Sequence, residues 1–173
     1  MADFNKAIEL NPKNGMAYQA RGCLRYDLRS FSDALSDFRT ECELKSGFLD
    51  YSQFRYYLVR ARQGDQERAT GDLKRFLQGR TFGRPGDWES QIGRFLSDQL
   101  SEANFINAAK DADPKRENSK RCEAHFYAGT KRLLGGDKTT AKAYFEKSPA
   151  TGEKDSREYA SARAELKYLE GAK

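Results

Sequence analysis

The chain has 173 residues, of which 38% are hydrophobic and 33% are charged, with a formal net charge of +5. This length can bury a substantial core, and the high charge content suits a narrow solenoid with much surface. The excess of bases is modest, 31 against 26 acids. No run of 18 apolar residues is present, so the sequence predicts no membrane span.

The first residues predict a short helix. Phe4, Ala7, Ile8 and Leu10 form an apolar pattern that ends before Pro12, which stops a helix. The pattern is typical of the second half of a helical hairpin, so we expect a chain cut from a longer protein. No signal peptide is visible. The expected location is cytoplasmic if the chain is native as given, and periplasmic or outer-membrane-associated if an upstream signal was removed.

A complete helical hairpin is expected from Gly15 to Ser46, with a turn at Arg29 and Ser30. Its second helix carries Asp33 to Phe38, a small residue followed four positions later by a large apolar one. This pattern recurs at 69–73 and 141–145, each time with a turn residue five positions before the alanine. Such self-similarity indicates a helical repeat. Gly22 is expected opposite Ala34, where it lets two helix backbones approach closely.

The middle of the chain departs from this pattern. A hairpin is expected over 50–77 with its turn at 63–65, followed by a loop at 79–86. Asp87 is expected to cap a helix that carries Trp88. A short helix over 105–112 and a polar connector over 111–121, whose end is compatible with helix, complete this part.

The last hairpin is expected to begin near Cys122, with a Gly135–Gly136 turn and Asp137 as an N-cap. Asp155 to Glu158 resembles a capping box. The helix after it is expected to cover the end of the stack with an apolar stripe of Tyr159, Ala162, Leu166 and Leu169. The predicted organisation is therefore 1–78 repeat hairpins with the first truncated, 79–121 a non-repeat helical segment and linker, and 122–173 a hairpin with a capping helix.

Tyr18, Gly22, Ala34 and Phe38 resemble the tetratricopeptide repeat, whose pattern calls for an aromatic, a Gly, an Ala and a Phe. Glu41 departs from it where a small residue is usual, and Ser46 replaces the closing proline. The run 121–129 and the segments that follow it are similar to bacterial repeat lipoproteins of the NlpI type. The resemblance implies an all-α, right-handed superhelix of antiparallel hairpins with an irregular helical insert. It also implies an adaptor that holds other enzymes near the outer membrane.

No catalytic or cofactor site is expected. His125 is the only histidine, and it occupies a position that packs against the neighbouring helix. Cys23, Cys42 and Cys122 have no disulfide or zinc spacing. The paired carboxylates Asp33 with Asp37 and Glu41 with Glu43 are expected on solvated helix faces. Gly79, Gly83 and Gly86 lack the ending of a phosphate loop. We therefore expect a non-catalytic protein without cofactor or metal.

The expected partner is another protein, bound as a peptide or helix along the concave side of the stack. The first helix of each hairpin lines that side, and several of its residues are types that anchor interfaces. A homodimer is compatible with this arrangement, and the Trp88 helix filling the groove is the intramolecular alternative. The candidate partner-binding residues are Met16, Gln19, Cys23, Tyr26, Asp27, Tyr51, Phe54, Leu58 and Arg62.

A second hypothesis is a polyanion or nucleic-acid binder that uses the basic 60–84 segment. Aromatic residues do not interleave regularly with these bases, so a nucleic-acid partner is less favoured than a protein and stays the alternative. The bases concerned are Arg60, Arg62, Arg68, Lys74, Arg75, Arg80 and Arg84.

Overall fold

The structure is a computed structural model that describes residues 1–80 and 86–171. Within them the chain is all-α, as predicted: ten helices pack largely as sequential antiparallel pairs, and there is no sheet. The helices are α1 Ala2–Leu10, α2 Gly15–Asp27, α3 Phe31–Leu44, α4 Leu49–Arg62, α5 Gln66–Gln78, α6 Trp88–Leu96, α7 Glu102–Ala108, α8 Pro114–Leu134, α9 Lys138–Ala150 and α10 Arg157–Gly171.

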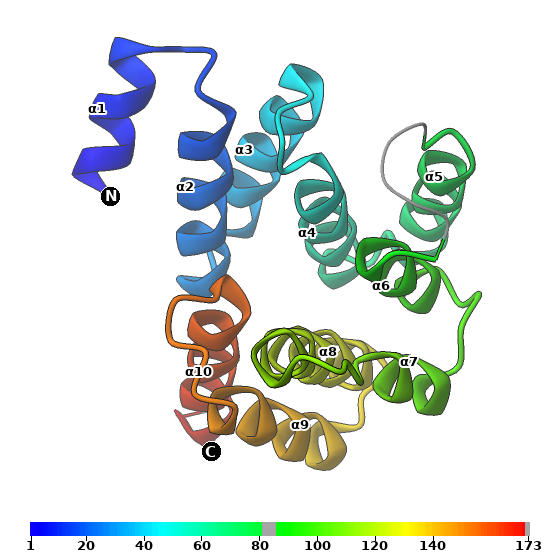
Figure 1. Ribbon diagram of the computed structural model, residues 1–173. Helices are drawn as coiled ribbons and strands as arrows, with labels where there is room; N and C mark the ends of the chain where they lie inside the picture. Colours follow the sequence, from blue (N-terminus) through cyan, green and yellow to red (C-terminus); the bar gives the residue numbers. More distant parts are fainter. Residues whose placement is uncertain (81–85, 172–173) are drawn as a thin grey trace. The chain divides into compact units, whose positions relative to one another are not determined.

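The helices belong to two compact units, Met1–Ala69 and Thr70–Lys173, and α5 crosses the boundary. In the first unit α2 packs between α1 and α3, and α4 packs on α3 with a smaller contact to α2 (Figure 1). In the second unit α8 and α9 form a hairpin, and α10 packs on both (Figure 1). Helices α6 and α7 contact each other and α8.

Glycines bring the paired helices together in both units. A Cβ on Gly22 would lie 2.8 Å from the ring of Phe38, and one on Gly129 would lie 2.7 Å from the ring of Phe145. Real side chains do not approach so closely, so each phenylalanine occupies the space that a side chain would fill. The side chain nearest to Gly22 is thus that of Phe38, one turn after the Ala34 that the sequence placed opposite this glycine.

Each first helix ends in the same turn, as the recurring pattern predicted. Arg29, Gly64 and Gly136 have positive φ angles of 65°, 87° and 83°. The residue after each donates its backbone N–H to a carbonyl five positions back, at 2.9 to 3.0 Å. This is a common way to satisfy the free carbonyls of a helix end. The donor and acceptor pairs are Ser30 with Arg25, Asp65 with Arg60, and Asp137 with Arg132.

Side-chain caps begin several helices. Asp87 accepts from the backbone N–H of Ser90 at 2.9 Å, and Asp137 accepts from that of Thr140 at 3.0 Å, which confirms both predictions. At α10 the predicted box is shifted by one residue. Ser156, not Asp155, accepts from the backbone N–H groups of Glu158 and Tyr159, at 3.1 and 3.5 Å.

The predicted connector at 111–121 is wrong over most of its length. Helix α8 already begins at Pro114, because a proline fits the first turn of a helix and Asp113 caps it by accepting from Lys115 at 2.9 Å. The last hairpin therefore starts about two turns earlier than Cys122. The predicted loop at 79–86 includes residues 81–85, which lie outside the described part of the chain.

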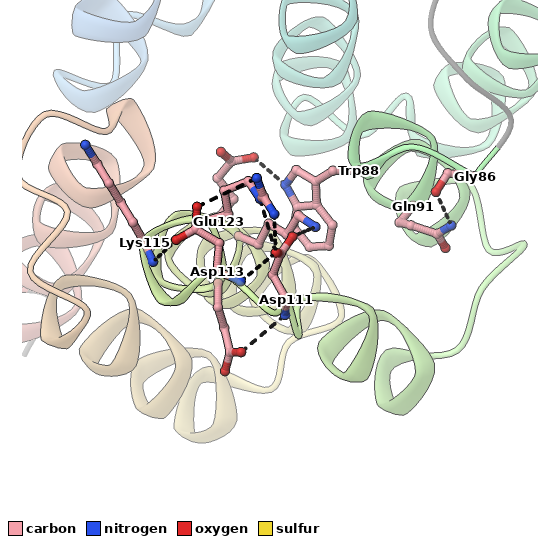
Figure 2. Close-up of polar contacts among 10 residues, drawn as sticks. Gly86, Trp88, Gln91, Asp111, Asp113, Lys115 and Glu123 are labelled. Carbon is pink, nitrogen blue, oxygen red and sulfur yellow. Dashed lines mark hydrogen bonds and ion pairs between the residues drawn. The ribbon is translucent and has the colours of Figure 1, made fainter.

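An aromatic stack attaches the irregular segment to α8. The ring of Phe105 lies parallel to those of Trp88 and Phe95, with centroids 5.4 and 4.3 Å away. Figure 2 shows Trp88 reaching α8, where its indole N–H donates to Glu123 at 2.8 Å. Helices α6 and α7 thus dock on α8 through the stacked rings and through polar contacts that include the bond from Trp88 to Glu123 and the ion pair of Arg132 with Glu102.

Ion pairs hold the turn before α8 (Figure 2). Asp111 accepts from Arg116 at 3.0 Å and from Lys120 at 2.8 Å. Hydrogen bonds from Arg116 and Lys120 hold the pKa of the Asp111 carboxyl well below its usual range. Glu117 accepts from the backbone N–H of Asp111 at 3.2 Å. The turn is therefore fixed by side chains of the helix that follows it.

Candidate partner-binding surface

The candidate residues of α2 are mostly buried. Gln19, Cys23 and Tyr26 are 7%, 3% and 0% exposed, because they face α3 and α4 in the core of the first unit. Asp27 is half-buried, whereas Met16 is 58% exposed. Of the five positions predicted on this helix, Met16 is the one that a partner reaches most easily.

The candidate residues of α4 divide in the same way. Phe54 and Leu58 are fully buried, and Tyr51 and Arg62 are half-buried. The structure brings Tyr26 and Arg62 together: the guanidinium donates to the Tyr26 hydroxyl at 2.8 Å and lies 5.1 Å above its ring. This pair joins α2 to α4, so its role is to stabilise the packing beneath the candidate surface.

The nine predicted residues therefore have two roles. Gln19, Cys23, Tyr26, Phe54 and Leu58 form core, and a partner cannot touch them while the unit keeps this fold. The remaining four, Met16, Asp27, Tyr51 and Arg62, are accessible at least in part. The sequence pattern did not separate the two groups, because aromatic residues suit cores and interfaces equally well.

The carboxylate of Asp37 is buried, at 2% exposed, so its predicted place on a solvated face is wrong. Arg21 binds it with two nitrogens at 2.6 and 3.0 Å, and Arg25 binds it at 2.7 Å. Arg21 also donates to Asn5 of α1 at 2.8 Å. Two guanidinium groups make burial of this charge tolerable, and they join three helices. The sequence signal that was missed is a pair of arginines one helical turn apart, Arg21 and Arg25, followed on the next helix by the acid Asp37.

Glu41 is a second correction, because it is 0% exposed and not on a solvated face. Its Oε1 accepts from the hydroxyl of Ser46, while its Oε2 has no geometric hydrogen-bond partner among the described residues. Burial raises the pKa of the Glu41 carboxyl, and the hydroxyls of Ser46 and Ser52 oppose part of that rise. Asp33 and Glu43, the other members of the predicted pairs, are exposed as expected.

Many bases of the 60–84 segment are already engaged. Arg60 binds Asp65 at 2.6 Å, Arg75 pairs with Asp72, and Arg80 binds Asp87 at 2.9 Å. Arg62 contacts Tyr26 as described above, while Arg68 is exposed and Lys74 half-buried. Arg84 lies outside the described residues. Paired bases attract phosphate groups weakly, so the segment offers less free positive charge than its sequence indicates.

His125 and the cysteines have structural surroundings. The imidazole lies against the ring of Tyr144, with centroids 5.8 Å apart. Burial, with smaller effects of Lys147 and Arg121, lowers the pKa of His125 to about 4, so the ring is neutral at pH 7. Cys23 and Cys122 are buried and Cys42 is half-buried, all as free thiols. No group of His, Cys, Asp or Glu in the described part of the chain has the arrangement of a metal site.

No protein-family model matches the sequence, and a search of curated proteins found no similar sequence. None of the helices in residues 1–80 and 86–171 is long and apolar enough to cross a bilayer.

Proposed function

We propose that this protein is a non-catalytic scaffold of the tetratricopeptide-repeat type, which binds a peptide or helix of a partner protein. The observation that carries the proposal is the recurrence of one hairpin design in two separate units. A glycine in the first helix lies under a phenylalanine sixteen residues later, as Gly22 under Phe38 and Gly129 under Phe145. Repeat folds of this kind work by presenting helix faces to other chains.

The left-handed turn residues at Arg29, Gly64 and Gly136 support the same proposal. They show equal spacing to the alanine that follows, which is the spacing of the repeat pattern. The resemblance to bacterial repeat lipoproteins adds an adaptor role to the proposal. In that role the protein would hold partner enzymes near a membrane surface.

The accessible part of the predicted surface supports a peptide with apolar anchors. Met16 is exposed on α2, and Tyr51 is half-buried on α4, where its ring lies 6.0 Å from that of Phe54. A thioether and an aromatic ring adapt to varied apolar side chains. Asp27 and Arg62, at the other ends of α2 and α4, add charges of both signs to this surface.

Site-specific photocrosslinking tests the proposal. A benzophenone amino acid is placed at Met16 or at Tyr51, and crosslinked proteins from host lysate are identified by mass spectrometry. We expect one or a few partners at both positions, because the two helices contact each other in the first unit.

The matched control carries the benzophenone at Arg39, which is exposed on α3 and pairs with Glu43 at 3.1 Å. Recovery of the same proteins from Arg39 as from Met16 and Tyr51 contradicts a specific surface. Recovery of none above background from Met16 and Tyr51 contradicts the proposed function.

A further inference from the structure

The outer face of α10 is a charged surface that the predicted capping role does not explain. The sequence predicted an inward stripe that included Tyr159 and Leu166. The structure buries Ala162 of that stripe together with Glu158, Ser161 and Glu165, and leaves Tyr159 and Leu166 half-buried. Because a helix repeats every 3.6 residues, these two residues lie on one flank of the buried side.

This face is hollowed. A cavity of about 640 Å³ is lined by residues that include Lys154, Tyr159, Arg163, Leu166 and Lys167. Tyr159, Arg163 and Lys167 are spaced four residues apart and form one stripe, about 12 Å long at 1.5 Å per residue. The stripe therefore spans two turns of the helix, with an aromatic ring at one end and a lysine at the other.

The positive charges of this hollow have no acidic partner within the described residues. Arg163 lies 5.9 Å over the ring of Tyr159, and neither Lys154 nor Lys167 takes part in an ion pair there. The acid on the lining, Glu170, faces Lys142 at 3.9 Å. In contrast, Arg21, Arg80 and Lys120 are all bound to carboxylates at 2.9 Å or less. The three cations that line this hollow are therefore available to an acidic partner.

We propose that the outer face of α10 binds an acidic amphipathic helix of a partner protein. This inference rests on the proposed scaffold function and adds a second surface to it. Two acids spaced four residues apart on the partner match Arg163 and Lys167, which have the same spacing. Apolar residues of the partner fill the hollow over Tyr159 and Leu166, while the charges guide the encounter.

The composition of the hollow favours a helix over a nucleic acid. Nucleic-acid binding commonly uses about 6 to 10 phosphate contacts, and three cations surround this hollow. The apolar surfaces of Tyr159 and Leu166 offer no hydrogen-bond donor or charge that matches a phosphate backbone. Leucine-like side chains of a protein partner cover those surfaces better. The same argument disfavours a bilayer surface, which would need a larger basic patch.

Fluorescence anisotropy with a designed probe tests the inference. The probe is a fluorescein-labelled peptide of about five helical turns, with leucines along one face and glutamates four residues apart. We expect it to bind the full chain, and the double variant R163E/K167E to bind about tenfold more weakly. The milder variant R163Q/K167Q removes the charges without reversing them, and should give an intermediate loss.

The control variant R94E/K110E makes the same change in net charge at two exposed cations that form no ion pair within 4 Å in the described chain. It should change the affinity less than about twofold, the scale of a distant surface charge. Far-UV circular dichroism establishes that each variant remains folded. A probe with glutamine in place of every glutamate should bind more weakly than the acidic one.

Four outcomes overturn the inference: no binding of the acidic probe, an equal loss in R94E/K110E, equal binding of the glutamine probe, or tighter binding of a labelled single-stranded oligonucleotide or of phosphatidylserine vesicles. Crosslinking at Met16 distinguishes this failure from a failure of the scaffold function, because it detects partners bound to the first unit, whereas α10 belongs to the second. Partners recovered at Met16 without probe binding at α10 refute the inference alone.

Discussion

The hairpins α2–α3 and α8–α9 have the same core geometry but different polar chemistry. Both place a glycine under a phenylalanine ring. The residue before that phenylalanine is Asp37 in the first hairpin, bound by two arginines, and Tyr144 in the second, which donates to Glu102 at 2.9 Å. The shared geometry thus requires little more than the small and large residues at the contact, and leaves the polar positions free to vary.

A further pair of equivalent positions in the two hairpins also differs in its polar chemistry. Three residues after the phenylalanine stand Glu41 in the first hairpin and Ser148 in the second, and both are fully buried. Ser148 satisfies its hydroxyl by donating to the carbonyl of Cys122 at 2.8 Å. Glu41 leaves one oxygen without a geometric partner among the described residues. The first hairpin therefore carries a destabilising feature that the second has avoided.

The largest expected effect tests the shared part of the comparison. Phe38→Ala and Phe145→Ala should each lower the free energy of unfolding by about 3–5 kcal/mol, because each removes a fully buried ring and leaves a cavity over a glycine. Urea denaturation measures the loss. Phe48→Ala, at a ring that is 37% exposed, is the control and should cost much less. Equal losses at Phe48 and Phe38 contradict the role of the glycine contact.

The second prediction concerns the polar difference. Asp37→Asn should cost about 3 kcal/mol, because two partly buried guanidinium groups lose their counter-charge. Tyr144→Phe, at the equivalent position, should cost about 1 kcal/mol, the scale of one hydrogen bond. Chemical denaturation of both variants compares them. A larger loss of unfolding free energy for Tyr144→Phe than for Asp37→Asn contradicts a stabilising role of the ion pairs of Asp37.

The third prediction is a dependence on pH. Because the folded-state pKa of Glu41 is raised above its unfolded value of 4.5, the folded state binds the proton more tightly, and stability is lost as pH rises from 4.5 through the folded-state pKa. Glu41→Gln should remove this loss and gain about 1 kcal/mol at pH 7. Thermal unfolding from pH 4 to 7 measures it. Glu43→Gln, at an exposed side chain, should leave the profile unchanged, and a profile unchanged in Glu41→Gln contradicts the prediction.

The smallest effect exchanges the turn residues. Arg29 has a φ of 65°, where Gly136 stands in the second hairpin, and left-handed geometry costs a non-glycine residue about 1 kcal/mol. Arg29→Gly should therefore stabilise the first unit by up to that amount, less the ring contact with Phe31. Gly136→Arg should destabilise the second unit by a similar amount. Changes of the same sign in both variants disprove the equivalence of the two turns.

The sequence predicted the all-α fold and its turns because both depend on local patterns. Glycine or arginine five residues before an alanine marked each turn, and Asp87 and Asp137 marked helix starts by their own chemistry. The start of α8 was missed because its first turns are charged, so apolar periodicity gave no signal there. The helix forms nevertheless, since Pro114 and Asp113 favour its start and Arg121 binds Glu117 one turn away at 2.6 Å.

The candidate surface was harder to predict because burial depends on neighbours that are distant in sequence. Tyr26 is a typical interface residue, but Arg62, 36 positions later, encloses it. Asp37 and Glu41 have the charge of surface residues, and their burial follows from packing with α2 and α4. On α10 the reverse occurred for Tyr159 and Leu166, which were assigned to the core but are half-buried. The apolar pattern of one helix does not determine which side of that helix the rest of the chain covers.

The stack that docks α6 and α7 on α8 also has a spectroscopic consequence. Trp88 is the single tryptophan of the chain, and it lies against Phe105 with its N–H bound to Glu123. Its emission therefore reports on the second unit, while circular dichroism at 222 nm, the usual helix wavelength, averages over both. Melting curves recorded by the two signals can be compared directly: coincident midpoints indicate one cooperative transition, and separate midpoints indicate two. The chain thus contains its own fluorophore for following the unfolding of one half of the molecule.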